Sequence, residues 1–281
     1  NIQIIKFSNN INISENNIFI SGLTIKNEIE TIIKYAENNK NKNFAIIVPE
    51  NMYGNTIIKH FEYTALKKNI NIVSKVFYDP LNPDFYEIAK LISNYENRSK
   101  KLLEQIELLK TENSESARKK IKVLQKEDTY GELNFDSLFI AVENFQQLSL
   151  LSSTLPYYDV DPKKVQYFGT SLWNKEAIIK EPGLNNSIFV SLDKDKLKIF
   201  NKIYRDFYTE SPHPIAVYGF DAIGIISSLN NQKLKINNDN IINNIGFNGL
   251  SGTFIFKNNG NVERDLALYR IKNEKIIKIK N

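Results

Sequence analysis

Few side chains in this sequence are of the types that catalyse reactions or hold metal ions. The chain of 281 residues has no Cys and two His, His60 and His213, so a thiol nucleophile is absent and a zinc site is not expected. His213 stands between Pro212 and Pro214, and neither His has a neighbouring Ser or carboxylate in a triad-like pattern. We therefore predict that the protein is not an enzyme and has no catalytic residue, metal or cofactor.

Glycine-containing motifs lead to the same prediction. The segment Gly169-Thr-Ser-Leu-Trp173 has a Ser two residues after a Gly, but Trp173 stands where a nucleophile elbow needs a second Gly. The sequence contains neither a phosphate-binding P-loop nor a dinucleotide fingerprint.

The composition and charge pattern favour neither nucleic-acid binding nor a membrane-spanning segment. The formal net charge is +5, but the Lys residues are scattered through an Asn- and Ile-rich background without a recognition-helix or base-stacking motif, so we expect no nucleic-acid binding. No apolar run approaches the roughly 18 residues that cross a bilayer.

The elements that would position functional side chains alternate between short apolar strands and amphipathic helices, which predicts βαβ units and a parallel sheet. Thr24 is the expected N-cap of the first helix. We expect strands at 2–7, 17–21, 44–48, 71–78, 135–142, 165–169 and 187–191, and helices at about 25–38, 57–68, 85–95, 146–155, 194–209 and 215–229, with a turn at 49–54.

Two segments depart from this alternation. Residues 96–127 are densely charged, lack Pro and carry apolar residues at helical spacing, which predicts an inserted helical hairpin: a solvated spacer or a protruding partner-binding element. At the C-terminal end, 253–256, a turn at 258–260 and 265–270 predict a hairpin, followed by a further strand around Ile276.

Several motifs together resemble type I periplasmic binding proteins, and more closely the penicillin-binding protein activator family of outer-membrane lipoproteins. The resemblance spans nearly the whole chain, and Phe220 stands where the family usually has Tyr. It rests on Phe44-Ala-Ile-Ile-Val-Pro49 with Tyr53-Gly54, Phe135-Asp136, Leu155-Pro-Tyr-Tyr-Asp-Val-Asp-Pro162, Gly169-Thr-Ser-Leu-Trp173, Glu181-Pro-Gly-Leu184, Phe220-Asp-Ala222 and Gly249-Leu-Ser-Gly-Thr-Phe-Ile-Phe256 with Glu263-Arg264.

The resemblance implies an α/β protein with the two-lobe type I periplasmic-binding-protein fold, in which parallel sheets are flanked by helices. It places residues 1–40 and 212–281 in lobe 1 and residues 41–211, with the insertion at about 96–127, in lobe 2. Lobe 1 would then be incomplete, and we expect either a trimmed fragment or a second polypeptide that completes the sheet.

In ligand-binding relatives the ligand lies between the lobes, at strand ends. By this resemblance Tyr53 would offer its hydroxyl to the cleft, or pack the turn. Glu143 follows a strand and could receive an amino group, or cap a helix. Thr170 and Ser171 could donate hydroxyl hydrogen bonds to a ligand.

Two further residues are candidates for the same cleft. Trp173, the only Trp, could wall the cleft or pack in the core or between the lobes. Asp221 is a cleft candidate whose competing role is to cap the helix that follows it.

Two functions remain open. The first is a periplasmic activator that docks on a bifunctional peptidoglycan synthase and is held at the outer membrane by an N-terminal lipid anchor outside this sequence. The second is a periplasmic solute-binding protein of an ABC transporter, which closes two lobes around an amino acid or a similar small polar ligand. A transcriptional regulator with the same core ranks last, because no DNA-binding headpiece is present.

Overall fold

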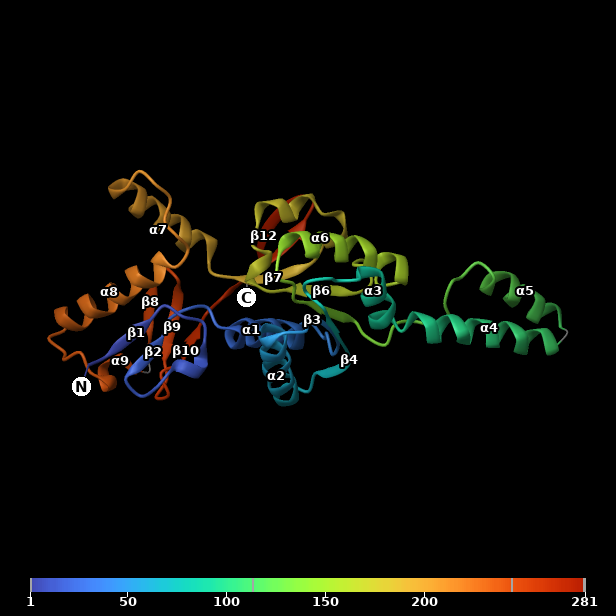
Figure 1. Ribbon diagram of the computed structural model, residues 1–281, viewed down its shortest axis with the longest axis horizontal. Coiled ribbons are helices and arrows are strands. Elements are labelled where there is room, and N and C mark those ends of the chain that lie inside the picture. The colour runs from blue at the N-terminus through green and yellow to red at the C-terminus, as the bar shows by residue number, and fades with distance from the viewer. Residues whose placement is uncertain (1, 113, 244, 280–281) are drawn as a thin grey trace.

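The chain folds into a large and a small lobe joined by three segments. The computed structural model describes residues 2–112, 114–243 and 245–279. The large lobe (residues 24–192 and 266–279) is built on a seven-stranded sheet of order β12-β11-β7-β6-β5-β3-β4 (Figure 1). Its strands are β3 (Asn43–Pro49), β4 (Asn71–Tyr78), β5 (Ser137–Ile140), β6 (Gln166–Gly169), β7 (Ile188–Ser191), β11 (Ala267–Lys272) and β12 (Lys275–Ile279).

The sheet is parallel from β4 to β7 and antiparallel at its β11–β12 edge. β3 is an interior strand between β5 and β4, and side chains from both of its faces are buried: Phe44, Ile46 and Val48 face one core, whereas Ala45 and Ile47 face the other. A strand buried on both faces is typical of a parallel sheet covered by helices.

Helices cover both faces of this sheet. α1 (Ile25–Asn38) and α2 (Met52–Lys67) pack on one face, and α3 (Phe85–Ser93) and α6 (Phe145–Thr154) pack on the other. Thr24 is the N-cap of α1, as predicted: its side chain accepts a hydrogen bond from the backbone N–H of Asn27. α2 begins five residues before the predicted start, because the Asn51 side chain caps it by accepting from the N–H of Gly54.

The predicted helical hairpin is confirmed. α4 (Tyr95–Thr111) and α5 (Glu115–Leu124) form an arm that projects from the large lobe (Figure 1). The base of the arm is closed where Arg98 O accepts from Tyr130 N at 3.1 Å and Ser99 Oγ donates to Asp128 O at 2.8 Å.

The small lobe (residues 2–23 and 208–265) contains two short sheets. β1 (Ile4–Lys6) and β2 (Ile18–Ile20) are parallel, and β8 (Phe247–Gly249), β9 (Gly252–Phe256) and β10 (Val262–Arg264) form an antiparallel sheet. Together with α8 (Ala216–Asn231) and α9 (Asn238–Ile241) they enclose a core in which Phe19 and Phe256 have ring centroids 5.1 Å apart.

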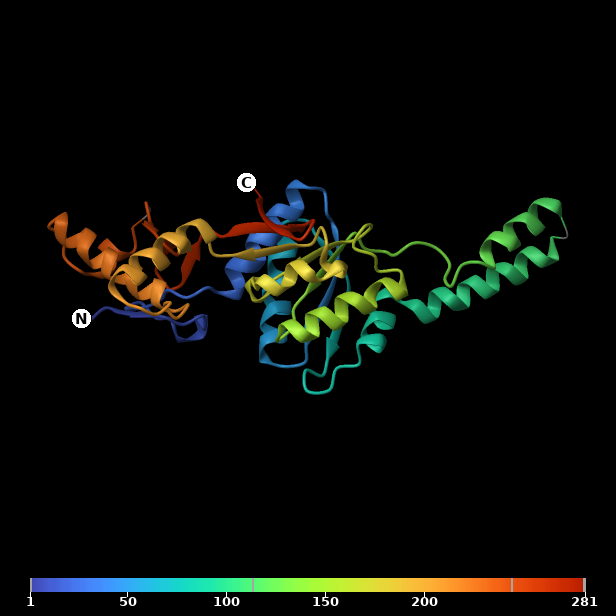
Figure 2. The ribbon, with the colours of Figure 1, turned by 90° about the horizontal axis from the view of Figure 1, so that it is seen from above.

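Three segments connect the lobes: residues 21–24, the segment 192–215 that contains α7 (Lys194–Phe207), and residues 264–267. Figure 2 shows the small lobe, the large lobe and the arm in succession along the long axis. Five 3-10 turns complete the described structure: η1 (Ile11–Ile13), η2 (Leu155–Tyr158), η3 (Ser171–Trp173), η4 (Glu176–Lys180) and η5 (Pro182–Leu184).

Two expectations from the sequence differ from this structure. Residues 25–40 and 267–279 were expected in the first lobe, but α1 packs on the large sheet and β11 pairs with β7. The C-terminal hairpin has the predicted first strand and turn, but its second strand is β10 and not residues 265–270. β9 pairs with β10 in the small lobe, whereas β11 pairs with β7 and β12 in the large lobe.

Among the described helices, none combines the length and the apolarity that a membrane-crossing segment requires.

Candidate functional site

A cleft of about 750 Å³ lies between the lobes, beside the connecting segments. Its large-lobe wall is formed where β6 and β7 end and where α2 begins after β3, so it lies at the carboxyl ends of parallel strands. Ligands of open α/β sheets bind at this edge. The lining residues are Phe7, Ser8, Asn9, Gly22, Leu23, Ile25, Glu28, Tyr53, Ser171, Leu172, Asn174, Ser191, Leu192, Leu197, Phe200, Asn201, Pro212, His213, Pro214, Ile215, Val217 and Tyr218.

Glu28 is the carboxylate of this cleft, and it comes from the first turn of α1. Its side chain does not cap the helix, because Thr24 already does so. Instead, Glu28 Oε1 accepts hydrogen bonds from the hydroxyl of Ser171 and, at 3.4 Å, from the Ser171 backbone N–H. Glu28 is 5% exposed.

Burial determines the electrostatics of Glu28. Removal from water raises the pKa of this carboxyl to about 7, although the two hydrogen bonds from Ser171 act in the opposite direction. None of the ion pairs found among the described residues includes Glu28. The cleft therefore contains a buried carboxyl group that no protein cation neutralises.

Tyr53 lies beside Glu28 at the start of α2. Its hydroxyl donates to Thr170 Oγ1 at 3.5 Å. Burial, followed by the negative charge of Glu28, raises the pKa of Tyr53, so the phenol stays protonated at neutral pH.

The structure brings three of the six predicted site residues together. Tyr53 and Ser171 line the cleft, and Thr170 is buried behind them, where it caps η3 and contacts the Tyr53 hydroxyl. Glu143 lies near Tyr53 but is exposed, outside the cleft lining, and its Oε1 accepts from the Asn51 side chain at 2.5 Å.

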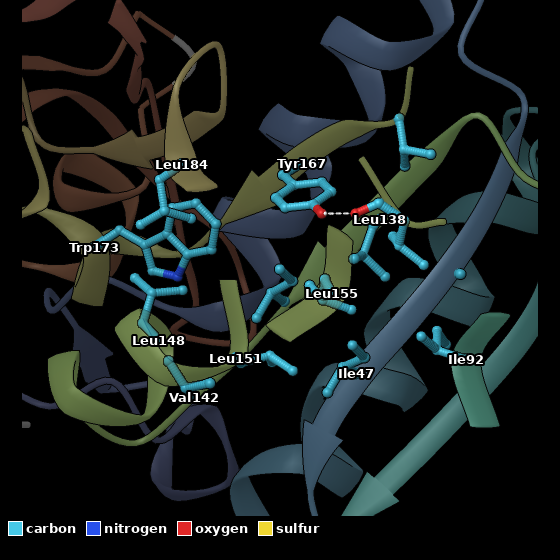
Figure 3. Packing of buried hydrophobic residues seen from close by; sticks show 14 of the residues in the cluster. Ile47, Ile92, Leu138, Val142, Leu148, Leu151, Leu155, Tyr167, Trp173 and Leu184 are labelled. Atoms are coloured by element: carbon cyan, nitrogen blue, oxygen red, sulfur yellow. Dashed lines mark hydrogen bonds between the residues drawn. The ribbon is translucent and has the colours of Figure 1, made fainter. Parts of the chain in front are cut away.

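Trp173 lies in the core of the large lobe and not at the cleft. Its side chain is fully buried among apolar residues that include Leu148, Val142 and Leu184 (Figure 3). β6 ends at Gly169, and the indole ring of Trp173 packs directly against this glycine. A Cβ at position 169 would lie 2.1 Å from two indole carbons of Trp173, so a larger residue does not fit there. The predicted cleft role of Trp173 is therefore corrected to core packing.

Asp221 is also corrected, because it neither lines the cleft nor caps a helix. α8 begins at Ala216, and the buried Asp221 carboxylate accepts from the backbone N–H groups of Leu250 and Ser251 at 2.8 and 2.9 Å and from the Ser251 hydroxyl. These bonds hold the turn between β8 and β9 against α8.

Arg264 extends this network to the connecting segments. Its guanidinium donates to the Ser251 hydroxyl and, at 2.7 Å, to the carbonyl of Ser21. Arg264 is 5% exposed, and it lies over the rings of Phe254 and Tyr218, 4.4 and 5.4 Å from their centroids. Two of the three connections between the lobes are thus tied together by one buried side chain.

Sequence reasoning missed Glu28, although a signal was present. Glu28 stands among Ile25, Ile29 and Ile32 on the apolar face of its helix, where a charged residue is unusual. In the described part of the chain, no group of three or more His, Cys, Asp or Glu could hold a metal ion.

Comparisons with known proteins bear on the fold. No family model and no curated protein sequence matches the chain. Among solved structures, a Rhodospirillum rubrum protein provisionally described as a branched-chain amino acid ABC transporter has a TM-score of 0.69 at 13% identity, over 96% of this chain and 69% of that one.

Two other solved structures are similar. A leucine-binding protein from Thermotoga maritima has a TM-score of 0.61 at 13% identity, over 99% of this chain and 72% of that one. A branched-chain amino acid substrate-binding protein from Streptococcus pneumoniae, in complex with isoleucine, has a TM-score of 0.53 at 16% identity, over 95% of this chain and 68% of that one. The chain therefore has the two-lobe type I periplasmic binding protein fold.

Proposed function

We propose that this protein is a non-enzymatic solute receptor that closes its two lobes around a small ligand. The observation that carries the proposal is the cleft itself: it lies between the lobes, at the carboxyl ends of parallel strands, and is lined by polar groups of Glu28, Tyr53 and Ser171. The lining also includes apolar side chains and further polar ones, among them Asn174 and Asn201, and a pocket of several hundred Å³ with convergent polar groups is typical of a small-molecule site.

The arrangement of the lobes supports the same function. Three segments connect the lobes, and two of them, 21–24 and 192–215, contribute residues to the cleft. In two-lobe proteins such segments act as hinges for closure around a ligand. Solved structures with this fold include receptors in complex with isoleucine, leucine and benzoate, so the fold accommodates small ligands of more than one chemistry. A receptor of this kind would act in the periplasm.

The experiment is a thermal-shift screen of the purified protein against small solutes grouped as cations, zwitterions, anions and neutral molecules. We expect at least one solute to raise the melting temperature in a saturable way and to reduce the radius of gyration in solution scattering. If no solute does so, the receptor function is refuted.

A second candidate function is activation of a bifunctional peptidoglycan synthase from a site on the outer membrane, which the sequence resemblance implies. The observation that favours it is the α4–α5 arm, which projects away from the cleft (Figure 1). Calorimetric titration of the periplasmic region of such a synthase tests it, with a variant that lacks residues 100–127 as the comparison. Binding that disappears with the arm would support this function, whereas equal heats with both proteins, or none, would refute a role for the arm.

A further inference from the structure

The charges around the cleft are one-sided. Glu28 is its only Asp or Glu, and no Lys or Arg occurs among the described residues that line it. A buried carboxylate without a partner cation is unfavourable, and Ser171 satisfies only one of its two oxygens in the bonds that the structure contains. A ligand cation would supply the missing charge.

Part of the remaining wall is apolar and suits an apolar body next to such a cation. Phe200 and Val217 are buried against the cleft, and the exposed Ile215 lies at its edge. Tyr53 and Tyr218 are aromatic neighbours of the carboxylate, and aromatic faces attract ammonium groups.

We propose that the ligand of this cleft is a small organic cation, an ammonium group on an apolar body, and that Glu28 is its counter-ion. This inference rests on the proposed receptor function and narrows it to one charge class. It also sets Glu28 apart from Glu143, which is exposed and already accepts a hydrogen bond from the Asn51 side chain.

Binding of such a cation requires the ionised form of Glu28, so affinity depends on pH. Because burial raises the pKa of Glu28 to about 7, the ionised fraction rises from about one-tenth at pH 6 to about nine-tenths at pH 8. The apparent affinity is proportional to the competent fraction, so we expect it to be about tenfold weaker at pH 6 than at pH 8.

Other titratable groups around Glu28 do not reproduce this dependence. Burial raises the pKa values of Tyr53 and Tyr218, which keeps both phenols protonated between pH 6 and 8. Asp221 and Arg264 lie beyond Tyr218 and are held in the network with Ser251. His213 also lines the cleft, and its side chain is exposed.

The test uses three probes with the same branched body: 3-methylbutylamine, 4-methylpentanoate and leucine. Calorimetric titrations of the whole chain at pH 6 and pH 8 are made with the wild type, Glu28→Gln and the control Glu30→Gln. Glu30 lies two residues along the same helix, outside the cleft lining, and pairs with Lys26. We expect the amine to bind at least about tenfold more tightly than the carboxylate, because a hydrogen bond to a charged group contributes about 1.5–3 kcal/mol.

Glu28→Gln should remove both the preference for the amine and the pH dependence, whereas Glu30→Gln should keep both. Tighter binding of 4-methylpentanoate, or pH dependence that persists in Glu28→Gln, would overturn the inference. If the solute screen yields only anionic or neutral ligands, the receptor function stands and the cation inference fails. If the screen yields no ligand, both fail.

Discussion

The unpaired carboxyl group of Glu28 makes a prediction about stability that needs no ligand. Its pKa in the unfolded chain is close to the ordinary 4.5, and burial raises it to about 7 in the folded protein. The folded state therefore holds this proton more tightly than the unfolded state. The contribution of the group to stability is fully present below pH 4.5 and is lost as the pH rises through 7.

The size of the effect follows from the shift. One pKa unit corresponds to about 1.4 kcal/mol, so a shift of about 2.5 units costs the folded protein about 3–4 kcal/mol well above pH 7, of which about 2–3 kcal/mol is lost between pH 5 and pH 8. Glu28→Gln cannot ionise. The free energy of unfolding of the wild type should therefore fall by about 2–3 kcal/mol relative to Glu28→Gln over this interval.

The assay is urea-induced unfolding at pH 5 and pH 8, followed by the fluorescence of Trp173, which is buried in the large lobe. The wild type and Glu28→Gln are compared at each pH, so that contributions from distant titratable groups cancel. Glu30→Gln, on the same helix, should follow the wild type. A difference between the wild type and Glu28→Gln that stays the same at both pH values would refute the assignment of a buried, unneutralised carboxyl group.

Three further predictions concern packing, the connecting segments and the arm. Gly169→Ala should cost about 2–3 kcal/mol by overpacking against Trp173, and less than about 1 kcal/mol in a Trp173→Leu background; equal costs in urea titrations followed by circular dichroism would contradict the contact. Arg264→Met leaves the Asp221 carboxylate buried without its guanidinium neighbour, and it should cost about 3–5 kcal/mol; an unchanged midpoint of thermal unfolding would contradict this. Joining the two ends of the arm by a short Gly linker in place of residues 100–127 should cost no more than about 1 kcal/mol, because the buried apolar residues Leu102, Ile106 and Ala117 lie outside the core clusters of the two lobes; a large fall in melting temperature would contradict this.

The sequence predicted those parts of the fold that local patterns determine. The strand at Asn43–Pro49 was predicted as 44–48 because every residue from Phe44 to Val48 is apolar, and such runs between turns are typical of parallel strands. The N-cap at Thr24 and the helical arm were predicted because capping and helical periodicity depend on residues a few positions apart.

The pairing of distant segments was not predicted. The hydrophobic alternation in β9 and β11 is similar, so the sequence offered no reason to place β9 in one lobe and β11 in the other. What decides their separation is the contact of β11 with β7, about 80 residues earlier in the chain, which a local pattern does not contain.

The same distinction explains which site residues were found. Tyr53, Thr170 and Ser171 follow strands directly, and strand ends can be located from local patterns, so these residues could be selected before the structure was known. Glu28 belongs to the cleft because α1 packs where Ser171 follows β6, 143 residues away in sequence. A Glu or Asp on the apolar face of a predicted helix indicates that its carboxyl group is buried. Such a group needs hydrogen-bond donors from another part of the chain or from a ligand. Among the described residues, the hydrogen bonds to Glu28 come from the hydroxyl and backbone N–H of Ser171, which is why we define the proposed ligand by its charge more than by its shape.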